Sequence, residues 1–360
     1  MRYKIAVILF LCVLSFTLFS CGEKKPVIDE KLESYSKLSS PANNSAIKSN
    51  DSIRVSLNLL KKIAGLDSAR ISFDNIPVAS LKNNETSFTW KPASQKLGAH
   101  KVSVAVFFSD GKKENLESNI RILSDAAPEN IKFTVVKTYP HSKDDFTEGL
   151  QIHKGFLYES TGLEGKSLIK KTELSTGKVL KEVSLDKEYF GEGMTILDNK
   201  IYQLTWKNKK GFVYNLDDFK LIQNFSYGTE GWGMTNNGKD LIMSDGTSNI
   251  YFMNPVSFSI KDKIQVCDNV GAIPNINELE YHSGFIYANV WRTFLVIKID
   301  PATGKVVSRI NLEELASKAG DHREIDVLNG IAVNPSTGNL LVTGKFWTKI
   351  FEIKLNELPA

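Results

Sequence analysis

Side chains that can move protons or stabilise charge recur in five short segments of the chain. These segments, which we call the motif segments, are residues 146–150 (FTEGL), 190–194 (FGEGM), 230–234 (EGWGM), 277–280 (NELE) and 328–331 (LNGI). The side chains in or near them that suit a reactive site are Glu148, Glu192, Trp206, Trp232, Asn277, Trp291 and Lys345. A carboxylate can exchange protons with a substrate, an amide and an ammonium can stabilise a developing negative charge, and indole rings can exclude water.

The motif segments recur at nearly constant intervals. Measured between equivalent positions the intervals are 44, 40, 46 and 51 residues, the positions being Gly149, Gly193, Gly233, Leu279 and Gly330. A four-stranded propeller blade takes about 40–50 residues, and seven blades of about 33 residues would be too short for four strands. Residues 131–360 therefore predict an all-β, five-bladed propeller. A strand near Phe133–Val136 is expected to pair with Ile350–Ile353 and close the ring.

Each reactive side chain also has a purely structural explanation. A single tryptophan in such a repeat is more often core than ligand contact, and a glutamate beside glycine can accept hydrogen bonds from backbone amides of a turn. Because carboxylates, an amide, an amine and three indoles occur together at equivalent positions of a repeat, we favour a pocket at one mouth of the central channel.

Residues 38–124 have a different pattern, with short alternating strands at 52–57, 69–73, 87–90 and 100–108. Clusters of Asn, Asp, Ser and Gly separate the strands. Six or seven short strands predict a small immunoglobulin-like β-sandwich, although the cysteine pair of antibody domains is missing. No set of reactive residues occurs here, which is typical of a spacer or adhesion module.

The N-terminus has the features of an export signal. In residues 1–20, two basic residues precede an apolar run of 15 residues from Ile5 to Phe19, and Cys21 follows at the position of a lipidated cysteine. The polar composition of residues 21–37 is typical of a solvated tether. We expect a protein of the cell envelope, anchored to the membrane by a lipid on Cys21 and facing the periplasm or the cell surface. The alternatives are an ordinary secretory signal or an uncleaved anchor.

Composition excludes several functions. The 45 basic and 41 acidic residues give a net charge of +4 without a basic cluster, which argues against nucleic-acid binding. The five histidines form no HxH or HExxH pattern, so no catalytic metal and no cofactor are expected. Cys267 is the only cysteine beyond the N-terminal region and is expected to be a buried apolar group. We expect a monomer.

The motifs FTEGL, FGEGMT, QLTW, EGWGMT, NELEY, YANVW and VTGKFW resemble those of the plant-type glutaminyl-peptide cyclotransferases and their bacterial relatives. The resemblance covers residues 131–357 in the same order and with similar spacing. It implies a five-bladed propeller that converts the N-terminal glutamine of peptides or proteins into pyroglutamate, with release of ammonia and without a catalytic metal.

The resemblance also implies roles for single residues. Glu192 matches the catalytic carboxylate, and Lys345 and Asn277 match polar groups near the reacting amide. Aromatic positions of the substrate pocket match Trp206, Trp232, Trp291, Phe146 and Phe190. Glu148 departs from the plant pattern, in which glutamine is usual; it either raises the pKa of Glu192 by charge repulsion or binds the ammonium of the substrate.

Two other functions remain compatible with the sequence. One is a lipid-anchored propeller that binds a protein or glycan without catalysis. The other is a metal-dependent, lactonase-like propeller, whose channel ion would be held by Glu148, Glu192, Asn277 and Asn329. Lys345 at the same mouth argues against the metal, and the combination of Glu192, Lys345 and Asn277 argues against a passive binding platform.

Overall fold

The structure is a computed structural model that describes residues 34–60, 65–82, 84–92 and 96–356. The predicted signal, the lipidation site Cys21 and most of the tether lie outside these residues. The described chain is all-β except for one helix, α1 (Glu313–Ala319). No helix in this part of the chain is long and apolar enough to cross a membrane.

The N-terminal unit contains two sheets. The first sheet has the order β1 (Ser36–Ser40), β3 (Ile53–Leu59), β6 (Ser87–Trp90). The second sheet has the order β2 (Ser45–Lys48), β8 (Lys113–Leu123), β7 (Gly98–Phe108), β4 (Leu66–Phe73), β5 (Ile76–Lys82). Alternate residues of β3 and β7, such as Val55 and Val104, are buried in one core shared by both sheets. These eight strands exceed the six or seven expected.

The rest of the chain forms five further sheets. The first sheet of the five has the order β11 (Thr147–His153), β12 (Phe156–Thr161), β13 (Leu168–Glu173), β14 (Lys178–Ser184). The second has the order β15 (Gly191–Leu197), β16 (Lys200–Thr205), β17 (Lys210–Asn215), β18 (Leu221–Ser226). The third has the order β19 (Met234–Asn236), β20 (Leu241–Ser244), β21 (Asn249–Met253), β22 (Ile260–Gln265). The fourth is β23 (Ile276–His282), β24 (Phe285–Val290), β25 (Leu295–Ile299), β26 (Val306–Asn311), to which β9 (Glu129–Asn130) adds in parallel. The fifth is β27 (Leu328–Val333), β28 (Leu340–Gly344), β29 (Lys349–Leu355), β10 (Phe133–Pro140).

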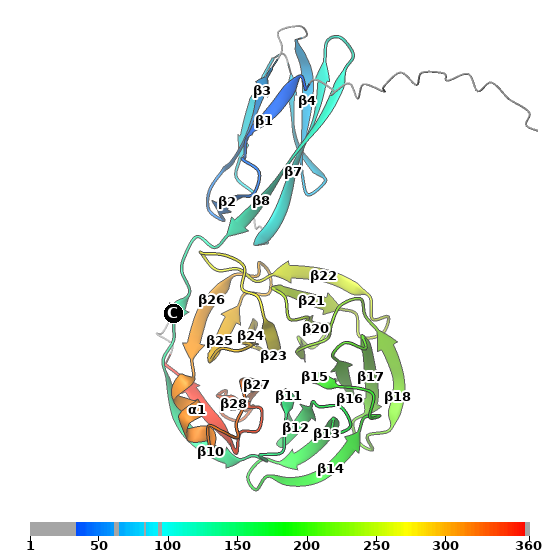
Figure 1. Ribbon diagram of the computed structural model, residues 1–360, viewed down its shortest axis with the longest axis vertical. Coiled ribbons are helices and arrows are strands. Elements are labelled where there is room, and N and C mark those ends of the chain that lie inside the picture. The colour runs from blue at the N-terminus through cyan, green and yellow to red at the C-terminus, as the bar shows by residue number, and fades with distance from the viewer. Residues whose placement is uncertain (1–33, 61–64, 83, 93–95, 357–360) are drawn as a thin grey trace, which may run out of the picture.

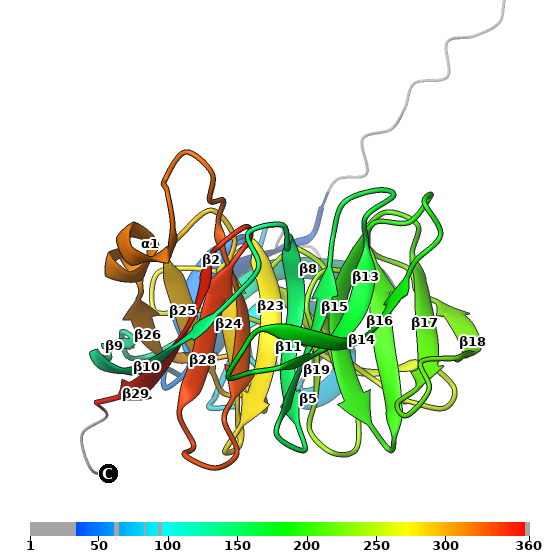
Figure 2. The same cartoon turned by 90° about the horizontal axis from the view of Figure 1, so that it is seen from below.

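The five sheets lie around a common centre, with their first strands innermost (Figure 1). Each inner strand contacts the next, in the order β11, β15, β19, β23, β27 and back to β11. The predicted pairing of the two ends of this unit is confirmed, because Val135 of β10 pairs with Ile353 of β29. Every motif segment lies at or directly before the start of an inner strand, and the segment 230–234 reaches β19 only at Met234. Helix α1 was not expected; it lies after β26, at one side of the ring (Figure 2), in the longest repeat interval.

Buried polar side chains connect the inner strands to one another. Glu278 of β23 accepts hydrogen bonds from the backbone N–H groups of Leu150 in β11 (3.2 Å) and Ile331 in β27 (2.8 Å). Gln151 of β11 accepts one from the backbone N–H of Ile196 in β15 (2.7 Å). Because an unpaired backbone amide is costly in a buried position, these bonds stabilise the close approach of the inner strands.

The N-terminal unit packs on the ring of sheets near β22. Cys267 is fully buried and belongs to the apolar core of the N-terminal unit. The backbone N–H of Leu97 donates to the carbonyl of Thr303 (2.7 Å), and the N–H of Ala99 donates to Gln265 Oε1 (2.9 Å). The expectation that Cys267 is a buried apolar group is thus confirmed, and burial raises the pKa of its thiol to about 11.

Candidate active site

One cavity of about 310 Å³ brings together all the residues that sequence patterns placed in a site. It is lined by Phe146, Glu148, Phe190, Glu192, Trp206, Trp232, Asn277, Trp291 and Lys345, which were expected, and by Arg292, Asp326 and Val327, which were not. Glu148, Glu192 and Asn277 lie in the inner strands β11, β15 and β23, and the other lining residues lie in segments that precede or follow strands of the five sheets. The expected convergence at one place in the ring is therefore present.

Irregularities in the inner strands explain why these side chains reach the cavity. The pairing of β11 with β12 shifts at Glu148, and in β15 the residues Glu192 and Gly193 together oppose a single residue of β16. In β23, Asn277 lies in the equivalent irregularity. A β-bulge of this kind bends a strand and re-aims its side chains, and bulges are common next to active sites.

The backbone of each irregular segment is held by a side chain from a neighbouring sheet. Ser160 donates to the carbonyl of Glu192 (2.5 Å), and Ser244 donates to the carbonyl of Asn277 (2.7 Å). Asn329 completes the pattern by donating to the carbonyl of Thr147 (2.9 Å), the residue before Glu148. These bonds fix the backbone positions from which the functional side chains project.

Two glycines of the motif segments are required by close packing. A Cβ atom at Gly193 would lie 2.4 Å from the backbone nitrogen of Met234, and one at Gly233 would lie 2.1 Å from the carbonyl oxygen of Asn277. Neither backbone atom can yield as a flexible side chain would. Gly193 and Gly233 thus permit neighbouring inner strands to approach, and the residues that precede them, Glu192 and Trp232, line the cavity.

A buried ion pair occupies one side of the cavity. Lys345 Nζ lies 2.6 Å from Glu148 Oε1, and Asn329 donates to Glu148 Oε2 (3.0 Å). The ammonium of Lys345 also lies 4.2 Å from the ring centroid of Phe146. Asn329 occupies in its motif segment the position that Glu148 and Glu192 occupy in theirs. This position in the repeat could have indicated its role.

The surroundings of Glu192 favour its protonated form. Burial, followed by the negative charge of Glu148, raises the pKa of Glu192 well above its ordinary value, while Lys345 opposes the shift. Burial also raises the pKa of Glu148, but Lys345 favours its charged form. Glu192 and Glu148 share a side-chain hydrogen bond, and this arrangement favours the proton on Glu192 while Lys345 balances the charge of Glu148. A carboxyl with a raised pKa can both accept and return a proton near neutral pH.

The indole walls are fixed by a residue that the sequence patterns did not indicate. Glu230 Oε2 accepts hydrogen bonds from the indole N–H groups of Trp206 (2.8 Å) and Trp232 (3.0 Å). The rings of Trp232 and Trp291 meet edge to face with centroids 5.4 Å apart. Glu230 is the first residue of the motif segment EGWGM. Its position two residues before Trp232 could have indicated that it binds the indole ring.

A network of buried charges lies beside the residues that precede Glu148. His141 Nε2 lies 3.1 Å from Glu159 Oε1, and Lys170 Nζ contacts both Glu159 (3.1 Å) and Asp145. Within the described chain, His141, Asp145 and Glu159 are the one group of three side chains close enough together to hold a metal ion. The ammonium of Lys170 already balances the two carboxylates, so the group fits a structural network better than a metal centre.

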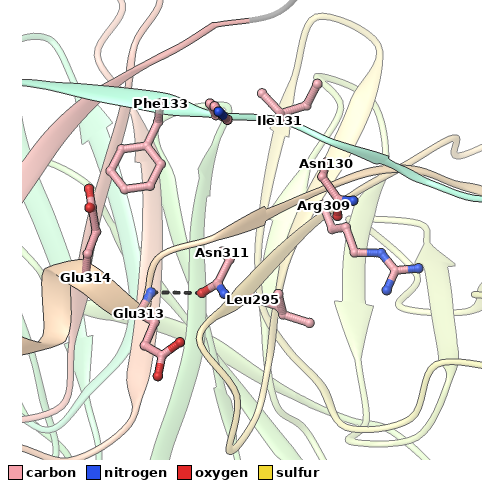
Figure 3. Close-up of a pocket in the computed structure, with 9 residues that line it drawn as sticks. Asn130, Ile131, Phe133, Leu295, Arg309, Asn311, Glu313 and Glu314 are labelled. Carbon is pink, nitrogen blue, oxygen red and sulfur yellow. Dashed lines mark hydrogen bonds between the residues drawn. The ribbon is translucent and has the colours of Figure 1, made fainter.

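A separate cavity lies on the outer side of the ring, between α1 and the segment that joins β9 to β10 (Figure 3). Its lining includes Phe133, Leu295 and Arg309, and Asn311 accepts a hydrogen bond from the backbone N–H of Glu313 at the start of α1 (3.0 Å). It contains none of the predicted site residues. The chemistry suggested by the motif segments belongs to the other cavity.

The family model described as glutamine cyclotransferase matches residues 105–355. The chain belongs to this family. It is 41% identical over 232 residues to a glutaminyl-peptide cyclotransferase of Arabidopsis thaliana, covering 63% of this chain and 72% of the relative. The crystal structure of glutaminyl cyclase from Myxococcus xanthus superposes with a TM-score of 0.60 at 33% identity, covering 64% of this chain and all of that one. The family match begins within β7, earlier than the boundary at residue 131 expected from the motifs.

Proposed function

We propose that this protein is a glutaminyl-peptide cyclotransferase, which converts the N-terminal glutamine of peptides or proteins into pyroglutamate and releases ammonia. The observation that carries the proposal is the buried Glu192, whose pKa is raised, beside the Glu148–Lys345 pair in a cavity walled by three indoles. Membership of the glutamine cyclotransferase family supports the same reaction. A cavity of about 310 Å³ accommodates one glutamine residue but not a folded protein partner.

The reaction requires two proton movements. The α-amine nitrogen forms a bond to the δ-carbon of the side-chain amide, and that carbon then loses its bond to the amide nitrogen, which leaves as ammonia. The amine must lose a proton and the leaving nitrogen must gain one. An α-amine has an ordinary pKa of about 8, so a carboxyl whose pKa is raised towards that value exchanges protons with it at little cost. Glu192 is the group proposed to carry the proton.

The other polar residues stabilise charge and orientation. Lys345 and the amide N–H of Asn277 are proposed to donate to the oxygen that becomes negative in the tetrahedral intermediate. Asn277 Oδ1 is buried and has no hydrogen-bond partner within the described residues, as expected of a group whose partner is a ligand or water. Phe146, Phe190 and the three indoles are proposed to exclude water and hold the folded glutamine side chain.

We also propose an architecture for the whole chain. Residues 131–360 would form a five-bladed propeller, supported by the closed series of contacts among the five inner strands and by the shared sheet of β10 and β29. Residues 38–124 would form an immunoglobulin-like sandwich, supported by two sheets around one core. The chain is proposed to act as a monomer.

The proposed location rests on the N-terminal sequence. Residues 1–20 are proposed to be a signal peptide, with the mature chain anchored by a lipid on Cys21 and facing the periplasm or the cell surface. Residues 21–37 would then separate the anchor from the first sheet.

The test is ammonia release from a dipeptide that begins with glutamine, with and without a chelator. The expected result is release at the same rate in both, because the described lining of the cavity includes no histidine or cysteine and the ammonium of Lys345 balances Glu148. A rate abolished by the chelator and restored by a metal would contradict the mechanism. Binding of the dipeptide without ammonia release would support the non-catalytic alternative.

A further inference from the structure

A second cavity adjoins the candidate active site. Its volume is about 520 Å³, and it shares Arg292, Asp326 and Val327 with the cavity that contains Glu192. The new part is built by the segment after β24 and by α1 with the loop that follows it. Its remaining lining residues are Thr293, Phe294, Ala316, Ser317, His322 and Ile325. The two cavities are therefore neighbours across a shared rim.

The walls of this second cavity are largely apolar. Phe294 is 38% exposed although it is a large aromatic residue, and Ala316, Ile325 and Val327 are half-buried. Helix α1 is anchored by its opposite face, where Leu315 and Ala319 are fully buried in the core of the last two sheets. An exposed aromatic group on an anchored, apolar surface beside a reactive cavity is typical of a site that binds an apolar side chain.

The rim between the cavities is polar and held in place. The guanidinium of Arg292 lies 4.3 Å from the ring centroid of Trp291, and its backbone has φ = +62°. Across the rim, the backbone N–H of Asp326 donates to the carbonyl of Lys345 (2.9 Å). Arg292 offers donors and Asp326 offers acceptors, the two kinds of group that a peptide bond needs.

The geometry points to a subsite for the residues that follow the N-terminal glutamine, with preference for an apolar residue directly after it. This inference rests on the proposed function. All atoms that react belong to the first residue of the substrate, so the rest of the peptide must leave the first cavity across its rim. The second cavity is continuous with that rim, and its apolar walls fit a side chain such as leucine. The opposite charges of Arg292 and Asp326 balance at the rim, so the rim favours neither an acidic nor a basic residue.

The test compares kcat and KM of the full chain for three tripeptide amides, Gln-Gly-Gly, Gln-Leu-Gly and Gln-Glu-Gly. The leucine peptide is expected to have a kcat/KM on the order of 10-fold higher than the glycine peptide, because a small apolar contact contributes a factor of this size. The difference should lie in KM, since the contact is made equally before and during the reaction. The glutamate peptide should resemble the glycine peptide.

Two variants make the test specific. Ser317 is exposed on α1 and lines the second cavity, so Ser317→Trp should fill it and bring the ratio of kcat/KM for the leucine and glycine peptides to about one. Lys318→Trp places the same bulk on the same helix outside the cavity lining and should keep the preference.

The outcomes separate the two proposals. Equal kcat/KM for the glycine and leucine peptides, or a leucine preference that survives Ser317→Trp, overturns the subsite while the cyclisation activity stands. A best rate with the glutamate peptide overturns the apolar preference. Absence of ammonia release from every peptide overturns the proposed function and the subsite with it.

Discussion

At the scale of single residues, Glu192 is the group whose chemistry can be tested most directly. Glu192→Gln keeps the size of the side chain and its ability to donate to Glu148 but removes the exchangeable proton. We expect kcat to fall by about 10²–10⁴ with a small change in KM. The measurement is ammonia release from a Gln-initiated dipeptide, with thermal unfolding as a control for folding. Equal rates for the variant and the wild-type protein would remove Glu192 from the mechanism.

The charges around Glu192 predict opposite pH shifts in two variants. The acidic limb of the pH profile of kcat/KM reports the pKa of Glu192, because Glu192 must lose its proton before it can accept one from the substrate. Glu148 raises the pKa of Glu192 and Lys345 lowers it. Glu148→Gln should therefore move the acidic limb to lower pH, and Lys345→Ala should move it to higher pH. Shifts in the same direction, or none, would contradict this electrostatic arrangement.

At the scale of the elements, the approach of the inner strands depends on glycine. In Gly233→Ala the new Cβ atom would lie 2.1 Å from the carbonyl oxygen of Asn277, so the strand that carries Asn277 must move. Overpacking of this kind costs about 1–3 kcal/mol, and both activity and the free energy of unfolding should fall. Gly228→Ala is the matched control, because no heavy atom beyond its chain neighbours lies within 4 Å of the position that the new methyl group would take. Equal stability of the two variants in denaturant titrations would contradict the packing argument.

At the scale of the whole molecule, the contact between the N-terminal unit and the ring predicts separate effects on activity and stability. A chain that begins at Ala127 keeps every residue of the candidate site but exposes Cys267, which is buried against the N-terminal unit. We expect kcat to be retained and the midpoint of thermal unfolding to fall. Loss of activity in a folded fragment would show that the N-terminal unit helps to build the site.

The anchor is tested on the full chain. Cys21→Ser should release the protein from the membrane fraction without changing kcat, because the candidate site lies in the ring of sheets. A fatty-acid probe should label the wild-type protein and not the variant. A wild-type protein that carries no label and fractionates as soluble would contradict the anchor.

Much of the fold and of the site could be predicted from the sequence, for a local reason. Glycine, glutamate and apolar residues recur with the period of a repeating unit, and each copy places the same kind of residue at the start of an inner strand. The repeat therefore indicated the five sheets and the pairing of β10 with β29, and the repeat together with the family resemblance indicated nine of the twelve residues that line the cavity. Helix α1 was not predicted because it occurs once and is not part of the repeated unit.

Only the tertiary structure decided how the site residues interact. Glu148 and Lys345 are 197 residues apart in the chain and form a buried ion pair, and Asn329 approaches the same carboxylate from the last sheet. Glu230 holds two indoles, and α1 builds the wall of the second cavity. These features depend on which distant residues meet in a space that excludes water. Because burial and neighbouring charge raise the pKa of Glu192, its acid–base behaviour is a property of the folded molecule and not of its local sequence.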